Sequence, residues 1–208
     1  MQKCSKGEIG TMTDKRVMST EEMAKSVAAV IYHLLERKKS VVVGIDGRCG
    51  AGKTSFAKQL QNILDCNVIH TDDFFLRPEQ RTKERLAKPG GNIDYERFRK
   101  EVILPLKEKS CFTYGIYDCH EGRITKTVAV EPKAVTIIEG AYSFHPQFSH
   151  IYDLKIFMDV EAQEQQRRII ERNGSEQLPL FTEKWIPLEE KYFDTFLIKE
   201  ECDIVIQI

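Results

Sequence analysis

The residues most able to do chemistry in this chain are two glycines, a lysine and a threonine that stand at a fixed spacing. Gly47 is followed, after four residues, by Gly52, Lys53 and Thr54, which fits the P-loop pattern. Glycines let successive backbone N–H groups turn inward around phosphate oxygens, because no side chain crowds the tightest points. The lysine ammonium would reach the β- and γ-phosphates, and the threonine hydroxyl would ligate Mg²⁺. The pattern predicts a nucleoside triphosphate site.

The residues on either side of this pattern predict the elements that position it. Residues 41–45 are rich in β-branched apolar side chains, as in a buried parallel strand. After Thr54, apolar residues recur at helical spacing. The glycines then precede a helix N-terminus, where free N–H groups and the helix dipole favour an anion. An ordinary glycine-rich turn is the alternative, and the flanking strand and helix argue against it.

Carboxylates follow two further apolar runs. Residues 67–71 predict a strand that ends in Asp72 and Asp73, and residues 134–140 predict a buried strand that ends at Glu139. In open parallel sheets functional groups collect at the carboxyl ends of strands. Because neighbours in an extended chain point to opposite sides, at most one of the two aspartates faces the phosphates. Glu139 has the place of an acid that holds Mg²⁺ directly or through water; a solvated turn or a helix N-cap is the alternative for the aspartates.

Arginines recur at two places in the remaining chain. Residues 77, 81 and 85 are arginines spaced by four, so they would share a helix face. Residues 161–172 predict a polar helix with three arginines, ended by a left-handed cap at residues 173–174. Such a stripe usually forms a solvated face, and the P-loop context favours a lid formed by this second helix. The arginines of that helix are Arg167, Arg168 and Arg172.

The other predicted elements complete an alternating pattern. His70 is interpreted as a packed strand-end histidine, and Pro105 as the residue that bends or ends a helix capped by Asp94. Alternating strands and helices after a P-loop predict a doubly wound parallel α/β sheet of the P-loop NTPase type. The remaining elements are a helix from Ser19 with Glu22 in a capping box, an antiparallel hairpin over 111–130, a strand over 151–160, a helix from Trp185 and a strand over 203–208.

Composition narrows the class of protein. The chain has 208 residues with a net charge of −1 and a pI near 6.5, which does not favour a nucleic-acid-binding protein. Six scattered cysteines without a CxxC pair favour a reducing compartment. No apolar run is long enough to span a membrane, and no signal peptide is recognised, so we expect a cytoplasmic protein. We expect a loose tail over 1–18 and a single domain over 19–208, with a lid near 161–178.

Several segments together resemble the uridine kinase and phosphoribulokinase family of P-loop kinases. The resemblance covers nearly all of the chain after residue 19, and an acidic-aromatic motif followed by NIDYERF is much narrower than the P-loop itself. Residues 185–193, WIPLEEKYF, also resemble the C-terminal helix of bacterial uridine kinase-like proteins. The other segments are GIDGRCGAGKTSFA (44–57), VIHTDDFFL (68–76), GGNIDYERF (90–98), IYD (116–118), TIIEGAYSFHP (136–146) and DLKIFMDVEAQEQQRRIIERNG (153–174).

The resemblance implies a kinase that uses ATP and Mg²⁺ to phosphorylate a hydroxyl of a small molecule, chiefly the 5′-hydroxyl of a nucleoside such as uridine or cytidine. It implies Asp72 as the acceptor of the hydroxyl proton, with Lys53 and Arg168 as further catalytic residues. Mg²⁺ would be held by Thr54, Asp72 and Glu139. Nucleotide binding is implied for Gly47, Arg48, Cys49, Gly50, Ala51, Gly52, Lys53, Thr54, Ser55, Arg167 and Arg172. Acceptor binding is implied for Asp72, Phe74, Asp94, Tyr117 and Glu139.

The sequence departs from the family pattern on the acceptor side. Uridine kinases carry a histidine a few residues after the hairpin tyrosine, whereas Gly122 stands near that place here and His120 is offset. Nicotinamide riboside kinases also carry a DDFF-type motif, so that nucleoside or a non-nucleoside alcohol is the alternative acceptor. A GTPase-like switch would need NKxD and DxxG motifs, and neither occurs. A nucleotide-binding regulatory subunit without transfer activity and a homo-oligomer both remain open.

Overall fold

The computed structural model describes residues 18–208, so the tail predicted over 1–18 lies outside the described residues except for Met18. Its main sheet has five parallel strands in the order β2–β5–β1–β6–β7. This sheet confirms the predicted doubly wound α/β class. The strands are β1 (Val41–Gly47), β2 (Cys66–His70), β5 (Val135–Glu139), β6 (Leu154–Asp159) and β7 (Ile204–Gln207).

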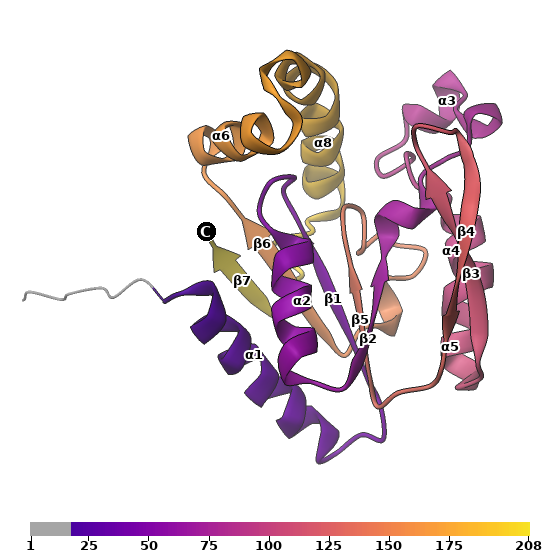
Figure 1. Cartoon of the computed structure of the whole chain (residues 1–208), viewed down its shortest axis with the longest axis vertical. Helices are drawn as coiled ribbons and strands as arrows, with labels where there is room; N and C mark the ends of the chain where they lie inside the picture. Colours follow the sequence, from indigo (N-terminus) through magenta and orange to yellow (C-terminus); the bar gives the residue numbers. More distant parts are fainter. Residues whose placement is uncertain (1–17) are drawn as a thin grey trace, which may run out of the picture.

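Helices cover both faces of this sheet (Figure 1). Val41, Val43 and Ile45 of β1 face a core shared with α1 (Thr20–Leu35) and α2 (Lys53–Ile63), whereas Val42 packs in a second core on the opposite face. The second core includes residues of α4 (Tyr95–Phe98) and α8 (Ile186–Phe196). The predicted capping box at the start of α1 is present: the Glu22 N–H donates to the Ser19 hydroxyl, and the Ser19 N–H donates to the Glu22 carboxylate.

An antiparallel hairpin stands apart from the main sheet, as predicted. Its strands are β3 (Phe112–Asp118) and β4 (Arg123–Val130), and Figure 1 shows it beside α4 and α5 (Leu104–Glu108). The helix does not end at Pro105, one of the two outcomes that we expected, because α5 runs on to Glu108. A π-helical turn (Arg99–Ile103) precedes the proline, and a wider turn of this kind accommodates an interruption of the regular hydrogen-bond ladder.

The segment between β2 and α4 differs most from expectation. Arg77, Arg81 and Arg85 do not share a helix face, because the chain forms two short turns here, η2 (Pro78–Gln80) and α3 (Lys83–Leu86). Thr82 caps the second turn by accepting from the Arg85 N–H. Each arginine binds a different partner, so tertiary contacts override the helical spacing.

The chain after β6 returns across the carboxyl edge of the sheet. α6 (Ala162–Asn173) matches the predicted helix, but Gly174 has φ 87° and ψ 155°, so it is not a left-handed helical cap. The strand predicted over 151–160 is shorter, because Ser149–Ile151 forms a 3₁₀ turn. None of the helices in residues 18–208 is long and apolar enough to cross a membrane. Between α6 and α8 lie a 3₁₀ turn (Ser175–Gln177), α7 (Leu178–Leu180) and a π turn (Phe181–Trp185).

Candidate active site

The phosphate loop joins β1 to α2 at the carboxyl edge of the sheet. Gly47, Gly50 and Gly52 all have positive φ values. A Cβ at Gly47, where φ is 135°, would lie 2.0 Å from the Met158 carbonyl oxygen, so only glycine fits beside β6 at this point. The sequence pattern therefore folds into the loop that it predicts.

Lys53 lies beneath this loop. Its ammonium donates to the Gly47 carbonyl at 2.6 Å and to the Arg48 carbonyl at 3.0 Å, and the residue is buried. These contacts hold the charge of Lys53 at the floor of the loop. Ala51 is buried beside it, whereas Thr54 and Ser55 are exposed at the start of α2.

Asp46 anchors the loop from β1, and the sequence interpretation did not single it out. One of its carboxylate oxygens accepts from the Gly47 N–H at 2.7 Å; the other accepts from the Phe144 N–H at 3.0 Å and the Tyr192 hydroxyl at 2.9 Å. Burial raises the pKa of Asp46 to about 6. The sequence did contain a signal for this role, because Asp46 is an acid at the end of an otherwise apolar strand.

Glu139 lies at the end of β5 and faces the loop. Its Oε1 accepts from the Thr54 hydroxyl at 3.0 Å and lies 2.5 Å from His70 Nδ1. The hydrogen bond to Glu139 raises the pKa of His70, against the effect of burial. His70 ends β2, as expected, and its half-exposed side chain packs against Glu139 and not in the apolar core. Parallel pairing opposes His70 and Glu139 in register, which brings the two strand ends together.

Asp72 and Asp73 lie in a 3₁₀ turn (η1, Thr71–Phe74), not in the extended chain that we expected. Asp72 is exposed to solvent, yet surrounding protein raises its pKa by desolvation; the charge of Lys53 opposes this rise and that of Glu139 adds to it. Asp73 instead has a hydrogen bond with the Tyr114 side chain, and desolvation raises its pKa. One aspartate therefore faces the loop and the other faces the hairpin.

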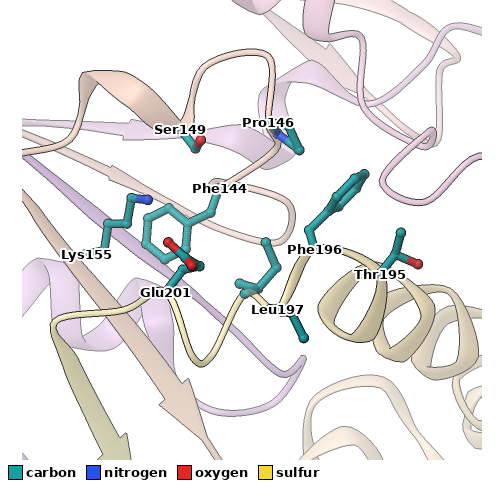
Figure 2. Close-up of a pocket in the computed structure, with 9 residues that line it drawn as sticks. Phe144, Pro146, Ser149, Lys155, Thr195, Phe196, Leu197 and Glu201 are labelled. Carbon is teal, nitrogen blue, oxygen red and sulfur yellow. The ribbon is translucent and has the colours of Figure 1, made fainter.

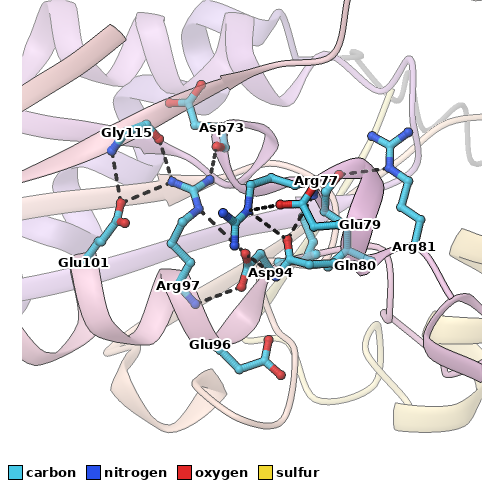
Figure 3. A network of polar contacts seen from close by, with 12 residues as sticks. Asp73, Arg77, Glu79, Gln80, Arg81, Asp94, Glu96, Arg97, Glu101 and Gly115 are labelled. Carbon is cyan, nitrogen blue, oxygen red and sulfur yellow. Dashed lines mark hydrogen bonds and ion pairs between the residues drawn. The ribbon is translucent and has the colours of Figure 1, made fainter. Parts of the chain in front are cut away.

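Asp94 caps α4 and is almost fully buried. Its Oδ1 accepts from the Arg97 N–H at 3.0 Å, and its Oδ2 accepts from Gln80 Nε2 at 2.8 Å. Figure 3 shows Gln80 and Arg97 converging on this carboxylate. Gln80 also accepts from the Arg77 N–H at 3.0 Å, so η2 is tied to α4 through one amide side chain. No motif or spacing in the sequence predicts that Gln80 binds Asp94.

Arg97 connects three elements around Asp94. It donates to the Gly115 carbonyl at 2.7 Å and to the Asp73 carbonyl, and its guanidinium carbon lies 4.1 Å from the centroid of the Phe74 ring. Its Nε is buried, and within the described residues it has no hydrogen-bond partner. The sequence interpretation did not single out Arg97, because its role depends on contacts with η1 and β3.

Two predicted acceptor residues lie behind this network. Phe74 is fully buried against Phe98 and Tyr114, with ring centroids 4.9 and 5.4 Å away. Tyr117 is also buried, and its hydroxyl accepts from Arg81 at 3.1 Å. Both side chains are therefore packed in the interior behind Asp94, and neither is exposed at the surface of the predicted acceptor site.

One of the three arginines of α6 reaches the phosphate loop. Arg168 donates to the Gly50 carbonyl at 3.3 Å and to Glu164 at 2.6 Å. Arg167 is exposed and pairs with acids of its own helix. Arg172 donates to Asn173 and lies 5.9 Å from the Phe181 ring centroid.

Side chains of α6 and α8, both in the C-terminal part of the chain, meet the phosphate loop around Cys49. The Cys49 N–H donates to Glu189 of α8 at 3.0 Å, and the Cys49 carbonyl accepts from Gln165 of α6 at 3.0 Å. Arg48 pairs with Asp159 at 2.7 Å and with Glu190. Burial raises the pKa of the Cys49 thiol to about 12, so it stays protonated. The sequence interpretation did not predict either glutamate contact.

Two cavities of about 300 Å³ each flank α6 and α8. One lies beside the loop, between Arg48, Gln165 and Gln207. The other, shown in Figure 2, lies at the far end of α8 between Lys155 and Leu197. No predicted site residue lines this second cavity, so it is separate from the candidate site.

Comparison with known proteins identifies the family of this chain. A model of the "Phosphoribulokinase / Uridine kinase family" matches residues 42–177. The chain belongs to this family. The matched range contains the phosphate loop, η1, Asp94, the hairpin, Glu139 and α6, so every element of the candidate site except α8 lies within it.

Individual relatives carry uridine kinase names. Uridine-cytidine kinase C of Dictyostelium discoideum is 31% identical over 126 residues, which are 58% of this chain and 28% of that protein. Uridine kinase of Bacillus cytotoxicus is 29% identical over 136 residues, which are 60% of this chain and 62% of that protein. The chain thus spans less than two thirds of the length of these relatives. A solved structure, a possible uridine kinase from Bacillus stearothermophilus, matches with a TM-score of 0.64 at 21% identity and covers 89% of this chain and 99% of its own, which supports the fold.

The family is one of P-loop kinases, and the residues present fit Mg²⁺. Residues 18–208 contain no cluster of three His, Cys, Asp or Glu residues that would form an all-protein metal cage. Glu139 Oε2, however, is buried and has no hydrogen-bond partner among these residues, and the Thr54 hydroxyl lies beside the same carboxylate. Mg²⁺ binds through one or two protein oxygens together with substrate phosphates, which matches this donor set.

Proposed function

We propose that this protein is an ATP-dependent kinase that transfers the γ-phosphoryl group to a hydroxyl of a small molecule, and that the acceptor is the 5′-hydroxyl of a nucleoside. The observation that carries the proposal is the common location of Asp72, Lys53 and Glu139. The pKa of Asp72 responds to both other charges, and Glu139 is hydrogen-bonded to Thr54 at the start of α2. An acid, a lysine and a hydroxyl–carboxylate pair therefore meet at one strand edge.

This arrangement supplies the parts that phosphoryl transfer needs. The acceptor oxygen would form a bond to the γ-phosphorus as the bond to the β–γ bridging oxygen breaks, and its proton would pass to Asp72. A carboxylate with a raised pKa is a better proton acceptor than an ordinary aspartate. Lys53 would stabilise charge on the transferred group. Thr54 and Glu139 would hold Mg²⁺, which when bound neutralises charge on the phosphate oxygens.

The acceptor side fits a molecule with adjacent hydroxyls. A carboxylate can accept about four hydrogen bonds, and each oxygen of Asp94 already accepts one. A ribose diol would therefore bind Asp94 either beside the Gln80 amide or in its place. Nicotinamide riboside carries the same sugar and is the alternative acceptor. Asp72 argues against a regulatory subunit without transfer activity, because such a subunit has no use for a base beside the loop.

We further propose that residues 19–208 act as one kinase domain with a lid near 161–178. The contact of Arg168 with the Gly50 carbonyl supports this, because it already brings one lid arginine to the loop. Closure of a lid would exclude water and limit ATP hydrolysis without an acceptor.

The proposal is tested by following ADP formation from MgATP with a panel of acceptors: uridine, cytidine, nicotinamide riboside and 2′-deoxyuridine. We expect ADP to form only when an acceptor is present, together with a phosphorylated product of the corresponding mass. Asp72→Asn should lose this activity, and Asp65→Asn, which changes an exposed aspartate before β2, serves as the matched control. ADP formation that is independent of every acceptor, or no ADP with any of them, would contradict the proposal.

A further inference from the structure

The phosphate loop already binds a carboxylate of this chain. Glu189 extends from α8, and its Oε2 accepts from the Cys49 N–H at 3.0 Å. Cys49 stands in the middle of the loop, between the positive-φ residues Gly47 and Gly50. Backbone N–H groups at such bends bind phosphate oxygens. Glu189 thus uses a donor that a nucleotide phosphate would need.

The carboxylate of Glu189 is buried, and burial is unfavourable for a charged group whose only role is to hold α8 in place. Glu189 is 5% exposed, and burial raises its pKa, with the charge of Lys53 opposing the rise. The Lys53 ammonium donates to loop carbonyls, so its help is electrostatic and not a hydrogen bond. A buried carboxylate without a directly bound cation is costly.

Other contacts already attach α8 to the loop. Glu190 pairs with Arg48, and the Tyr192 hydroxyl donates to Asp46 at 2.9 Å. Neither contact uses an N–H group of the loop, whereas Glu189 occupies that of Cys49. A purely structural role therefore does not require Glu189 to enter the loop.

The segment before α8 contains an irregular turn that could absorb a movement. A π turn (Phe181–Trp185) leads into α8, and such turns are interruptions of a helix that recur at functional sites. Arg172 of α6 lies over the Phe181 ring at 5.9 Å. Movement at the start of α8 would therefore reach the helix that carries Arg168.

We propose that Glu189 is an internal phosphate mimic, and that the phosphates of an incoming nucleotide must displace it from the loop and move the start of α8. Two anions cannot share one buried donor, because their charges repel strongly at hydrogen-bond distance in a poorly screened site. Nucleotide binding and the α8–loop contact are then mutually exclusive. The inference rests on the proposed function in that the loop must bind a nucleotide.

The chain has a single tryptophan, and its position makes the test direct. Trp185 is half-buried and ends the π turn four residues before Glu189. We expect its fluorescence to change when MgATP or magnesium tripolyphosphate is added to the wild-type protein, and to stay constant with adenosine. This first measurement needs no variant, and an unchanged signal with tripolyphosphate would overturn the proposal.

The second measurement compares affinities for MgATP. Glu189→Ala removes the competing carboxylate and should bind MgATP about tenfold more tightly, the change that corresponds to one modest competing contact. Asp194→Ala removes an exposed acid from the same helix and should stay within about twofold of the wild type. Equal or weaker binding by a folded Glu189→Ala protein would overturn this inference alone. No MgATP binding by either the wild type or Glu189→Ala would overturn the proposed function as well.

Discussion

The candidate site has two halves that are built in different ways. We call the phosphate loop with Lys53 the donor half, and the residues around Asp94 the acceptor half. The donor half is a backbone structure: β1, three positive-φ glycines and the start of α2 fix the loop, and Asp46 holds its first N–H. The acceptor half is a side-chain structure around Asp94, in which Gln80 and Arg97 tie η2, α4, η1 and β3 together. A backbone-built site can be recognised from a local motif, whereas a side-chain-built site depends on partners far apart in the sequence.

The largest effect should come from the donor half, where Lys53→Ala removes the charge beneath the loop. Loss of one preorganised charge that stabilises the transition state lowers kcat by about 10³-fold. If the two halves are separate, the KM of the acceptor stays within about twofold. Steady-state kinetics with MgATP and uridine measure both values. Lys58→Ala, an exposed lysine on the same helix, should retain full activity; near wild-type activity of Lys53→Ala would contradict the assignment of the loop.

Asp72→Asn tests the residue that lies between the halves. The variant keeps the shape of the side chain and loses the proton acceptor, and such a loss lowers kcat by about 10²-fold or more. Asp73→Asn is the matched control, because Asp73 is directed toward Tyr114 and should affect kcat less. The measurement is kcat at saturating MgATP and acceptor. An equal loss in both variants would show that the two acids act through the fold and that Asp72 is not the base.

The elements that the sequence predicted correctly are those whose signals are local. The capping box at Ser19 lies within four residues, and the loop from Gly47 to Thr54 lies within eight, so neither can be missed for want of a residue far away in the sequence. The strand-end location of Glu139 also follows from a short apolar run in a parallel sheet.

The failures occur where a distant partner decides the structure. Arg81 and Arg85 have helical spacing, but Tyr117 and Glu96 bind them in different directions, and the helix does not form. His70 pairs with Glu139, which lies 69 residues away. Glu189 reaches Cys49 across 140 residues. No periodicity or motif near these residues contains that information.

Asp94→Asn should act on the acceptor half alone. Asparagine caps helices as well as aspartate does, so α4 should survive, while one charged acceptor for sugar hydroxyls is lost. We expect the KM of uridine to rise by about tenfold, the effect of a lost hydrogen bond to a charged group, with the KM of MgATP unchanged. The preference for uridine over 2′-deoxyuridine should fall as well, because the wild-type carboxylate rejects an analogue that leaves it unpaired. If acceptor KM and sugar preference do not change, the nucleoside assignment fails.

The last effect concerns stability and not activity: it is the stability of the acceptor half in acid, and it centres on His145. The imidazole ring stacks on Tyr95, next to Asp94, with centroids 4.6 Å apart, and only 7% of the residue is exposed. Burial, and then the nearby charge of Arg85, lower its pKa from 6.5 to about 4. The folded protein therefore binds this proton less readily than the unfolded chain. The stability that His145 contributes is present at pH values above 6.5 and is lost as the pH falls toward 4.

This linkage corresponds to about 2 kcal/mol less free energy of unfolding at pH 5 than at pH 7.5. His145→Phe keeps an aromatic ring against Tyr95 and removes the titrating group, so its stability should fall less over the same range. Urea unfolding of both proteins at the two pH values isolates the contribution of His145, because every other titration occurs in both. His120→Gln, which removes an exposed histidine, should behave as the wild type. If the free energy of unfolding of the wild type and of His145→Phe changes equally with pH, water reaches His145 in the folded protein. The acceptor half would then be more open than the donor half, whose loop is fixed by backbone contacts.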